Sequence, residues 1–281
     1  MSRRVLREQG VAGFDLEARL LCEKASGKTR EAFIRDAAHY PPDGRFEREL
    51  MSFLARRAGG EPIAYITGEW AFYSLPMEVS PDVLIPRADT EILAERAIKI
   101  LKGAAGGGAP LRVLDLCCGT GCVGLAIAAN VPDARVTLAD NSDAALRLAR
   151  ANTARNALTR RAAVSSADAL APPPPLFGSF EMIVCNPPYI PTADLDGLEP
   201  SVRAYEPRAA LDGGEDGLAF YRRVAASWKT LLQKGGFLLF ECGAGQAQAV
   251  MNILREHRYT GIAAAKDLQG IDRVVEGCVT S

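Results

Sequence analysis

The sequence lacks several features that would assign a protein to a class at once. Its 281 residues contain no run of 18 apolar residues, so we expect no membrane span. Only two histidines are present, and no pair of Cys-x-x-Cys motifs, which argues against a metal site and against a Ser–His or Cys–His hydrolase. With 33 Lys and Arg against 34 Asp and Glu, the net charge of -1 gives no broad attraction to nucleic acid.

The N-terminus also lacks a targeting signal. Residues 1–8, Met-Ser-Arg-Arg-Val-Leu-Arg-Glu, have no apolar core of the kind found in a signal peptide. Seven cysteines are present, three of them crowded between residues 117 and 122, and free thiols in a reducing compartment explain them best. We therefore expect a cytoplasmic protein. Its 48% hydrophobic and 24% charged residues are typical of a globular chain with a substantial core.

The first 86 residues divide into two patterns. Residues 1–60 predict a small helical domain, because their apolar side chains recur at helical spacing. These side chains form two groups: Phe14, Ala18, Leu21 and Cys22, then Phe46, Leu50, Phe53 and Leu54. Residues 61–86 change to short β-like runs that are rich in aromatic residues and broken by Gly68, Pro76 and Pro81. This second pattern predicts a β-hairpin connector.

The remainder, residues 87–281, predicts a second and larger domain in which strands and helices alternate. The expected strands are 112–116, 135–139, 162–166, 180–185, 236–242, 261–265 and 273–277. The expected helices are 89–101, 123–129, 143–156, 218–232 and 246–256. This alternation predicts an α/β fold, Rossmann-like, with a mostly parallel seven-stranded sheet between two layers of helices. In such sheets the ligand binds beyond the carboxyl ends of the strands.

The first of these strands ends in an acidic, glycine-rich loop. Residues 115–121 read Asp-Leu-Cys-Cys-Gly-Thr-Gly, which is not the Gly-x-Gly-x-x-Gly fingerprint of a pyrophosphate site. The second strand ends at Asp140, where a carboxylate can accept both hydroxyls of a ribose, and the third ends at Asp168. Three acids at successive strand ends suit an ammonium, a ribose diol and an adenine amine. S-adenosylmethionine carries all three groups. A nicotinamide cofactor is the main alternative, but its binding sites favour the Gly-x-Gly-x-x-Gly motif, which is absent here.

The fourth strand leads directly into Asn186-Pro187-Pro188-Tyr189. An amide or aromatic amine nitrogen is a poor nucleophile because its lone pair is delocalised. Two acceptors for its N–H groups would draw it towards tetrahedral geometry and free the lone pair for attack on a methyl group. The Asn186 side chain offers one carbonyl and the Pro187 backbone offers the second, oriented by the fixed φ of proline. Tyr189 can stack on the planar group.

Together these motifs resemble those of class I S-adenosylmethionine-dependent amino methyltransferases. Longer stretches resemble the PrmC/HemK family in particular. These stretches are residues 61–68, 83–91 and 206–218, and the pattern Glu241-x-Gly-x-x-Gln246. The resemblance runs from about Glu61 to the C-terminus and implies methylation of the side-chain amide nitrogen of a glutamine, in a Gly-Gly-Gln type of motif, in peptide chain release factors.

The resemblance also implies roles for individual residues. The residues expected to bind the cofactor are Asp115, Cys117, Cys118, Gly119, Thr120, Gly121, Asp140, Asp168 and Asn186. Asn186 and Pro187 are the expected catalytic residues, which accept hydrogen bonds from the substrate amide, while Pro188 and Tyr189 line its pocket. The helical domain and the hairpin are expected to help grip the release factor.

Three positions depart from the family pattern. Cys117 and Cys118 stand where the family usually has Gly-Thr or a similar pair, Ala88 replaces a common proline, and Ala169 replaces an aromatic residue of some members.

Three alternatives stay open. An adenine-N6 nucleic-acid methyltransferase would use the same tetrapeptide but needs a basic stripe around the site, to which Arg203, Arg208, Arg222 and Arg223 can contribute. A ribosomal-protein glutamine methyltransferase shares the chemistry. A non-catalytic adaptor would keep the fold and lose cofactor binding. Our expectation is a protein substrate, with no nucleic acid, membrane or metal involved.

Overall fold

The computed structural model describes residues 2–36, 44–104 and 109–280. By its internal contacts the chain divides into two compact units. The first consists of Met1–Glu69 with Glu199–Tyr205, and the second of Trp70–Leu198 with Glu206–Ser281. The change from one unit to the other falls within residues 61–86, for which a connector is predicted. In the described ranges, no helix has both the length and the apolar composition needed to cross a membrane.

The first unit is helical, as its apolar spacing predicts. Its helices are α1 (Ser2–Glu8), α2 (Phe14–Ser26), α3 (Arg30–Arg35), α4 (Arg45–Ala58), α5 (Ile63–Thr67) and α9 (Pro200–Tyr205). Leu6, Leu21 and Leu54 are buried in its core. An ion pair of 2.6 Å between Arg57 Nε and Glu17 Oε2 joins α4 to α2.

The prediction of short β-like runs from residue 61 onward is wrong at its start, because residues 63–67 form helix α5. Pro62 precedes this helix with its φ fixed near the helical value, and Gly68 ends it with a φ of 72° that suits glycine. All five side chains of α5 are buried. Burial therefore overrides the strand propensity of its β-branched and aromatic residues.

A β-hairpin does follow, formed by β1 (Glu69–Phe72) and β2 (Leu75–Glu78). Its turn residues, Tyr73 and Ser74, both have positive φ, at 49° and 64°, which matches the twist of a tight hairpin. Asn152 joins β2 to a helix of residues 143–155 within the second unit. Its amide nitrogen Nδ2 donates to Glu78 O at 3.0 Å, and its Oδ1 accepts from Glu78 N at 2.6 Å.

The second unit is built on a seven-stranded sheet with the order β5-β4-β3-β6-β7-β9-β8. The strands are β3 (Leu111–Leu116), β4 (Ala134–Asp140), β5 (Ala162–Ser166), β6 (Phe180–Cys185), β7 (Leu232–Glu241), β8 (Thr260–Lys266) and β9 (Asp272–Cys278). The first five strands in this order are parallel, and β9 is antiparallel to both of its neighbours. The predicted mostly parallel sheet is confirmed.

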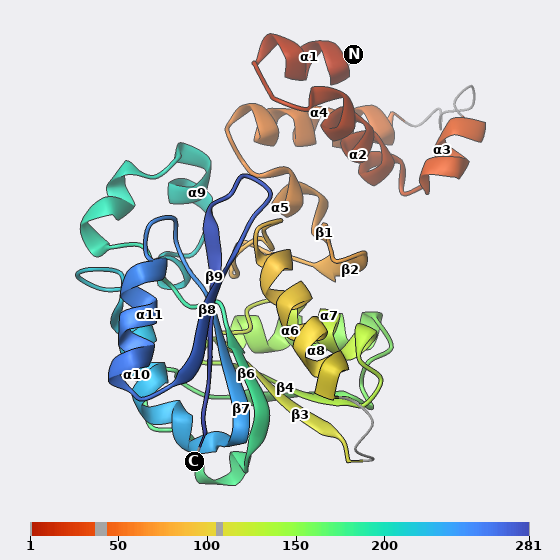
Figure 1. Cartoon of the computed structure of the whole chain (residues 1–281). Coiled ribbons are helices and arrows are strands. Elements are labelled where there is room, and N and C mark those ends of the chain that lie inside the picture. Colours follow the sequence, from red (N-terminus) through yellow and green to blue (C-terminus); the bar gives the residue numbers. More distant parts are fainter. Residues whose placement is uncertain (1, 37–43, 105–108, 281) are drawn as a thin grey trace. The chain divides into compact units, whose positions relative to one another are not determined.

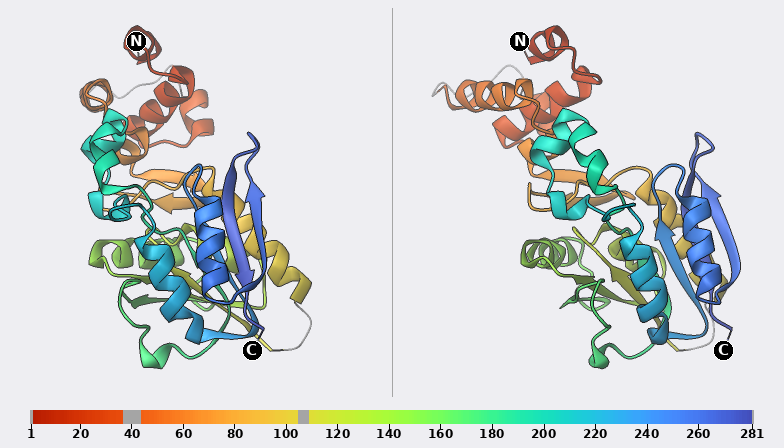
Figure 2. Two further views of the ribbon diagram at one scale, coloured as in Figure 1. Left: turned by 60° about the vertical axis from the view of Figure 1, so that its left-hand side comes forward. Right: turned by 90° about the vertical axis from the view of Figure 1, so that its left-hand side faces the viewer.

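Helices cover both faces of this sheet (Figures 1 and 2). They are α6 (Thr90–Ala104), α7 (Cys122–Asn130), α8 (Asp143–Arg155), α10 (Ala219–Ser227) and α11 (Ala247–Glu256). Tyr221 of α10, Leu254 of α11 and Trp228, which follows α10 directly, are buried in one cluster with Phe180 and Phe240 of the strands. Trp228 also donates from Nε1 to Ala169 O at 3.1 Å, so its one polar group is satisfied inside the core.

The segment between α10 and β7 differs from its predicted form. Helix α10 ends at Ser227 and continues as a 3₁₀ turn, Trp228–Leu231, and β7 begins at Leu232, four residues before the predicted strand start. A bulge makes this longer strand possible. The register between β6 and β7 shifts after Phe180, and Gly235 takes a φ of 78° there.

The pairing register of the strands shows which residues lie together at the carboxyl edge of the sheet. Leu116 at the end of β3 pairs with Ala139 of β4 and with Cys185 of β6, and Cys185 pairs with Phe240 of β7. The carboxyl ends of four neighbouring strands therefore lie at one edge, where polar residues that follow them come together.

Gly124 lets α7 approach the sheet closely. A Cβ built on this residue would clash with Leu138 and lie 2.9 Å from both Asp115 Oδ2 and Val136 Cγ1. Alanine normally stabilises a helix interior over glycine by about 1 kcal/mol, but overpacking costs about 1–3 kcal/mol. We expect Gly124→Ala to lower the free energy of unfolding by up to about 2 kcal/mol in urea titrations.

Gly103 of α6 is the matched control for this experiment. No described atom lies within 4 Å of a Cβ built on it. Gly103→Ala should therefore leave stability unchanged or raise it. A Gly124→Ala protein as stable as the wild type would show that α7 does not need this close approach.

Candidate active site

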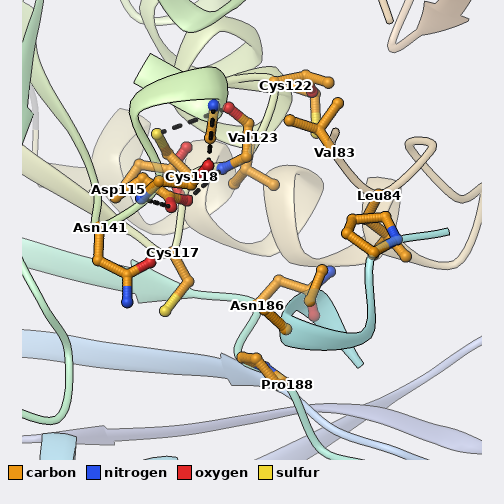
Figure 3. A pocket seen from close by; sticks show the side chains of 18 of the residues that line it. Val83, Leu84, Asp115, Cys117, Cys118, Cys122, Val123, Asn141, Asn186 and Pro188 are labelled. Carbon is orange, nitrogen blue, oxygen red and sulfur yellow. Dashed lines mark hydrogen bonds between the residues drawn. The ribbon is translucent and has the colours of Figure 1, made fainter. Parts of the chain in front are cut away.

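A cavity of about 210 Å³ lies at the carboxyl edge of the sheet. Its wall combines the loop after β3, the end of β4 and the residue that follows β6. Residues from these three places that line it include Asp115, Cys117, Cys118, Gly119, Thr120, Asp140 and Asn186. Figure 3 shows Asp115, Cys117 and Cys118 on one side of this cavity, with Asn186 and Pro188 on the other. The cavity therefore joins the two motifs that the sequence placed 70 residues apart in the chain.

The loop after β3 is shaped by its backbone. Cys117, Gly119 and Gly121 have positive φ values of 61°, 52° and 81°, and Cys118 N donates to Ala139 O at 3.0 Å. A side chain at Gly121 would also press on Leu138, 3.0 Å away. Of these three residues, Cys117 is the one that is not glycine. A non-glycine residue in the left-handed region of φ and ψ costs of order 1 kcal/mol. Here a cysteine adopts the left-handed backbone at a position where the family resemblance implies glycine.

Two buried acids belong to this wall. Asp115 is only 2% exposed, and its Oδ2 accepts a hydrogen bond of 2.8 Å from Gly124 N. Burial raises the pKa of Asp115 to about 7. Asp140 accepts from Gly119 N at 2.9 Å and from Ser142 N at 3.0 Å, and burial raises its pKa as well. A bound cationic group would compensate the buried charge of Asp115.

Asp168 lies differently from the other two acids. Its side chain is exposed, and its Oδ1 accepts a hydrogen bond of 2.8 Å from Leu170 N. Its neighbours in sequence, Ala167 and Ala169, line the cavity in its place. A contact between the Asp168 carboxylate and the cofactor stays a prediction. Gly121 likewise shapes the loop without being part of the cavity wall that the described residues form.

The tetrapeptide after β6 is held from several sides. Asn186 Nδ2 donates to Thr90 Oγ1 at 3.3 Å, and Tyr189 O accepts from Gln246 Nε2 at 2.8 Å. Asn186 and Pro188 belong to the described cavity wall, whereas Pro187 is buried and Tyr189 half-buried outside it. The predicted roles of Pro187 and Tyr189 therefore stay predictions.

Three glycines permit the close packing around Tyr189. A Cβ on Gly213 would lie 2.7 Å from Tyr189 Cα, one on Gly217 would clash with Tyr189 O, and one on Gly243 would lie 3.1 Å from Tyr189 Cδ2. Larger side chains at these three glycines would therefore collide with or press on the tetrapeptide.

Sequence reasoning missed several residues of this region. Val83 and Leu84 line the cavity, Thr90 and Glu241 lie at Asn186, and Gln246 holds Tyr189. All five lie in segments 83–91 or 241–246, which carried the family resemblance but received no role. That resemblance was the signal available in the sequence.

The cavity fits S-adenosylmethionine by the chemistry of its wall. Asp140 offers a carboxylate for a ribose diol, and Asp115 provides a buried negative charge for a cation. Apolar side chains that suit the adenine ring and the alkyl groups on the sulfonium complete the wall: Val83, Leu84, Val123, Ala145, Ala167 and Ala169. These residues would hold the cofactor.

The arginines that could form a basic stripe are largely engaged. Arg222 pairs with Asp216 at 2.6 Å and Arg208 with Asp212 at 3.7 Å, while Arg223 Nε donates to Leu170 O at 2.7 Å. A neighbouring carboxylate thus offsets the charges of Arg208 and Arg222, which weakens the case for a nucleic-acid substrate.

Two family models match this chain. The model for the Methyltransferase small domain matches residues 98–196, and the model for the PrmC N-terminal domain matches residues 2–68. Among curated relatives, a release factor glutamine methyltransferase of Geobacter sulfurreducens is 40% identical over 276 residues, covering 98% of this chain and 93% of the relative. One from Caulobacter vibrioides is 38% identical, with 97% and 92% covered.

Solved structures share the fold. The catalytic domain of hMettl16, in complex with MAT2A 3′UTR hairpin 6, superposes with a TM-score of 0.57 at 14% identity, covering 85% of this chain and 83% of that one. A methyltransferase from Pyrococcus furiosus gives a TM-score of 0.53 at 15% identity, with 81% and 98% covered. At these identities the likeness concerns the fold alone.

The sheet order and the acid-lined cavity at its carboxyl edge define a class I S-adenosylmethionine-dependent methyltransferase with an N-terminal helical region. Within that class, the near-full-length identity decides the family: the chain belongs to the release factor glutamine methyltransferases.

Substitution of Asp140 tests whether this cavity binds the cofactor. We expect Asp140→Ala to raise the dissociation constant for S-adenosylmethionine about 10- to 100-fold, because a carboxylate with two hydrogen-bonding oxygens is lost. Isothermal titration calorimetry measures this. Asp143→Ala, three residues further on and exposed, is the control and should bind normally. Equal affinities for both variants would remove Asp140 from the site.

Proposed function

We propose that this protein transfers a methyl group from S-adenosylmethionine to the side-chain amide nitrogen of the glutamine in a Gly-Gly-Gln motif of peptide chain release factors. Relatives named for this activity match the chain over almost its whole length. The proposal includes action in the cytoplasm, where translation takes place, and a role for the N-terminal helices and the hairpin in gripping the release factor.

One observation carries the proposal. The Asn186 amide lies in the same cavity as Asp115 and Asp140, so an amide acceptor stands beside the place that fits the cofactor. Its Nδ2 is engaged by Thr90, which leaves Oδ1 as the group that can receive a substrate N–H. An acceptor in this position suits a substrate amide, whose nitrogen carries two hydrogens.

The chain's own residues act by orientation. Asn186 Oδ1 and the Pro187 carbonyl accept the two N–H hydrogens of the glutamine amide and loosen the conjugation of its lone pair. Pro188 and Tyr189 hold the planar group between them. S-adenosylmethionine, when bound, supplies a methyl group on a positively charged sulfur that leaves as a neutral thioether. The glutamine nitrogen gains the new carbon bond and releases one proton, so the site needs no strong base.

The first test identifies the substrate. Purified release factor, adenine-containing DNA and adenine-containing RNA are each incubated with the protein and radiolabelled S-adenosylmethionine. We expect label only on the release factor, mapped by mass spectrometry to the glutamine of its Gly-Gly-Gln motif. A release factor with that glutamine changed to alanine is the control and should stay unlabelled. Label on adenine, or on no substrate despite cofactor binding, would refute the proposal.

Asn186→Ala tests the acceptor role. Removing one oriented polar contact to the reacting group should lower kcat by at least about 100-fold, because it acts mainly in the transition state. The dissociation constant for S-adenosylmethionine should change much less than kcat, because Asn186 is only one of the residues expected to bind the cofactor. Unchanged turnover would take Asn186 out of the mechanism, and a large loss of cofactor affinity would make it a binding residue instead.

A further inference from the structure

A buried glutamate stands directly behind the acceptor. Glu241 is the last residue of β7, beside β6, and only 3% of it is exposed. The side chains of Thr90 and Asn186 interact with its carboxyl group and act to lower its pKa. Its Oε2 has no hydrogen-bond partner in the described part of the chain. A buried carboxyl with an unsatisfied oxygen lowers stability, so a purely structural role does not explain it.

The chemistry of the neighbours suggests what Glu241 does. An asparagine amide can rotate by half a turn, which exchanges its donor NH₂ and its acceptor oxygen. Methyl transfer needs the oxygen of Asn186 to face the substrate, so the NH₂ must face the opposite side. On that side lie the Thr90 hydroxyl, at 3.3 Å from Nδ2, and the Glu241 carboxyl. A hydroxyl can donate as well as accept and does not by itself distinguish the two orientations.

A carboxylate does distinguish them, because it only accepts hydrogen bonds. We propose that Glu241 is a positioning residue for methyl transfer: as a carboxylate beside Thr90, it holds the Asn186 NH₂ inward and thereby presents Oδ1 to the substrate nitrogen. This inference rests on the proposed function. Glu241 acts through Asn186 and is absent from the described wall of the cavity.

Protonation of Glu241 would release this control, since a carboxylic acid can donate to Oδ1 and stabilise the rotated amide. Burial raises the pKa of Glu241 to about 7. That pKa already includes the lowering by the Thr90 side chain, the raising by the Asp89 charge, and the lowering by Arg273 and Asn186. Arg273 also pairs with Asp89 at 2.8 Å and with Asp267 at 3.0 Å, so its charge is shared. The other titratable groups that interact with Glu241 are the neutral side chains of Cys122, Tyr189, Tyr221 and Cys242.

The ionisation of Glu241 determines whether turnover rises or falls with pH. Asn186 is held in the productive orientation when Glu241 is ionised, so turnover should rise with pH through about 7 and level off above it. The experiment uses the full chain with purified release factor as substrate, from pH 6 to 9. We expect kcat to fall about tenfold for each unit below that pKa, the slope for one required deprotonation.

Glu241→Gln removes the charge and keeps the shape. We expect kcat at pH 8 to fall about 10- to 100-fold, with KM for the release factor and the dissociation constant of S-adenosylmethionine nearly unchanged. The acid limb of the pH profile should disappear. The melting temperature should stay the same or rise, because an unsatisfied buried carboxylate is gone. A variant with wild-type kcat, or one that keeps the acid limb, would overturn the positioning role.

Glu276→Gln is the matched control. Glu276 is also buried, on neighbouring strand β9, and it pairs with Arg96 at 2.6 Å, away from the cavity. This substitution should lower the melting temperature and leave the pH profile of kcat intact. A lost acid limb in this control would show that the profile reports folding, which would overturn our inference.

A double mutant tests whether Glu241 acts through Asn186. If it does, adding Glu241→Gln to Asn186→Ala should lower kcat less than about twofold further, because the group being positioned is already absent. Multiplying losses would overturn the inference and leave the proposed function intact. A wild-type protein that fails to methylate any release factor would overturn both.

Discussion

Polar groups that are buried or half-buried at the carboxyl edge of the sheet need hydrogen-bond partners inside the protein, and neighbouring elements of the second unit provide them. Asp115 takes its partner from the first turn of α7, Asn186 from Thr90 at the start of α6, and Asp140 from the loop after β3. Each of these elements is thereby fixed to the strand ends. The hydrogen bonds that make burial tolerable also join α6, α7 and the loop after β3 to the strand ends.

The cavity is supported by hydrogen bonds and close packing on the side away from the cofactor loop. Helix α6 and strand β7 hold the tetrapeptide at Asn186, while Gln246 before α11 holds it at Tyr189. Close packing against Gly213 and Gly217 removes the remaining freedom. Catalysis by orientation requires such support, because an acceptor that can rotate gains little over water. The supporting residues come from sequence segments far from the tetrapeptide itself.

Much of the fold could be predicted because the periodic pattern is local. Strands 162–166 and 180–185 have the bounds that the sequence predicts, and the parallel order follows from their alternation with helices. Helix α5 could not be predicted, since its burial depends on contacts with helices distant in sequence. The exposure of Asp168 and the burial of Glu241 are tertiary properties too. Both are acids near a strand end, and only the packing around each separates them.

The left-handed backbone of Cys117 has a consequence for how such chains are recognised. The loop is defined by three torsion angles, and here one of them is kept by a cysteine although glycine adopts it more easily. Residue type alone therefore does not indicate the backbone shape at this position. A motif search that demands glycine there would discard this chain, whereas a template built on torsion angles would retain it.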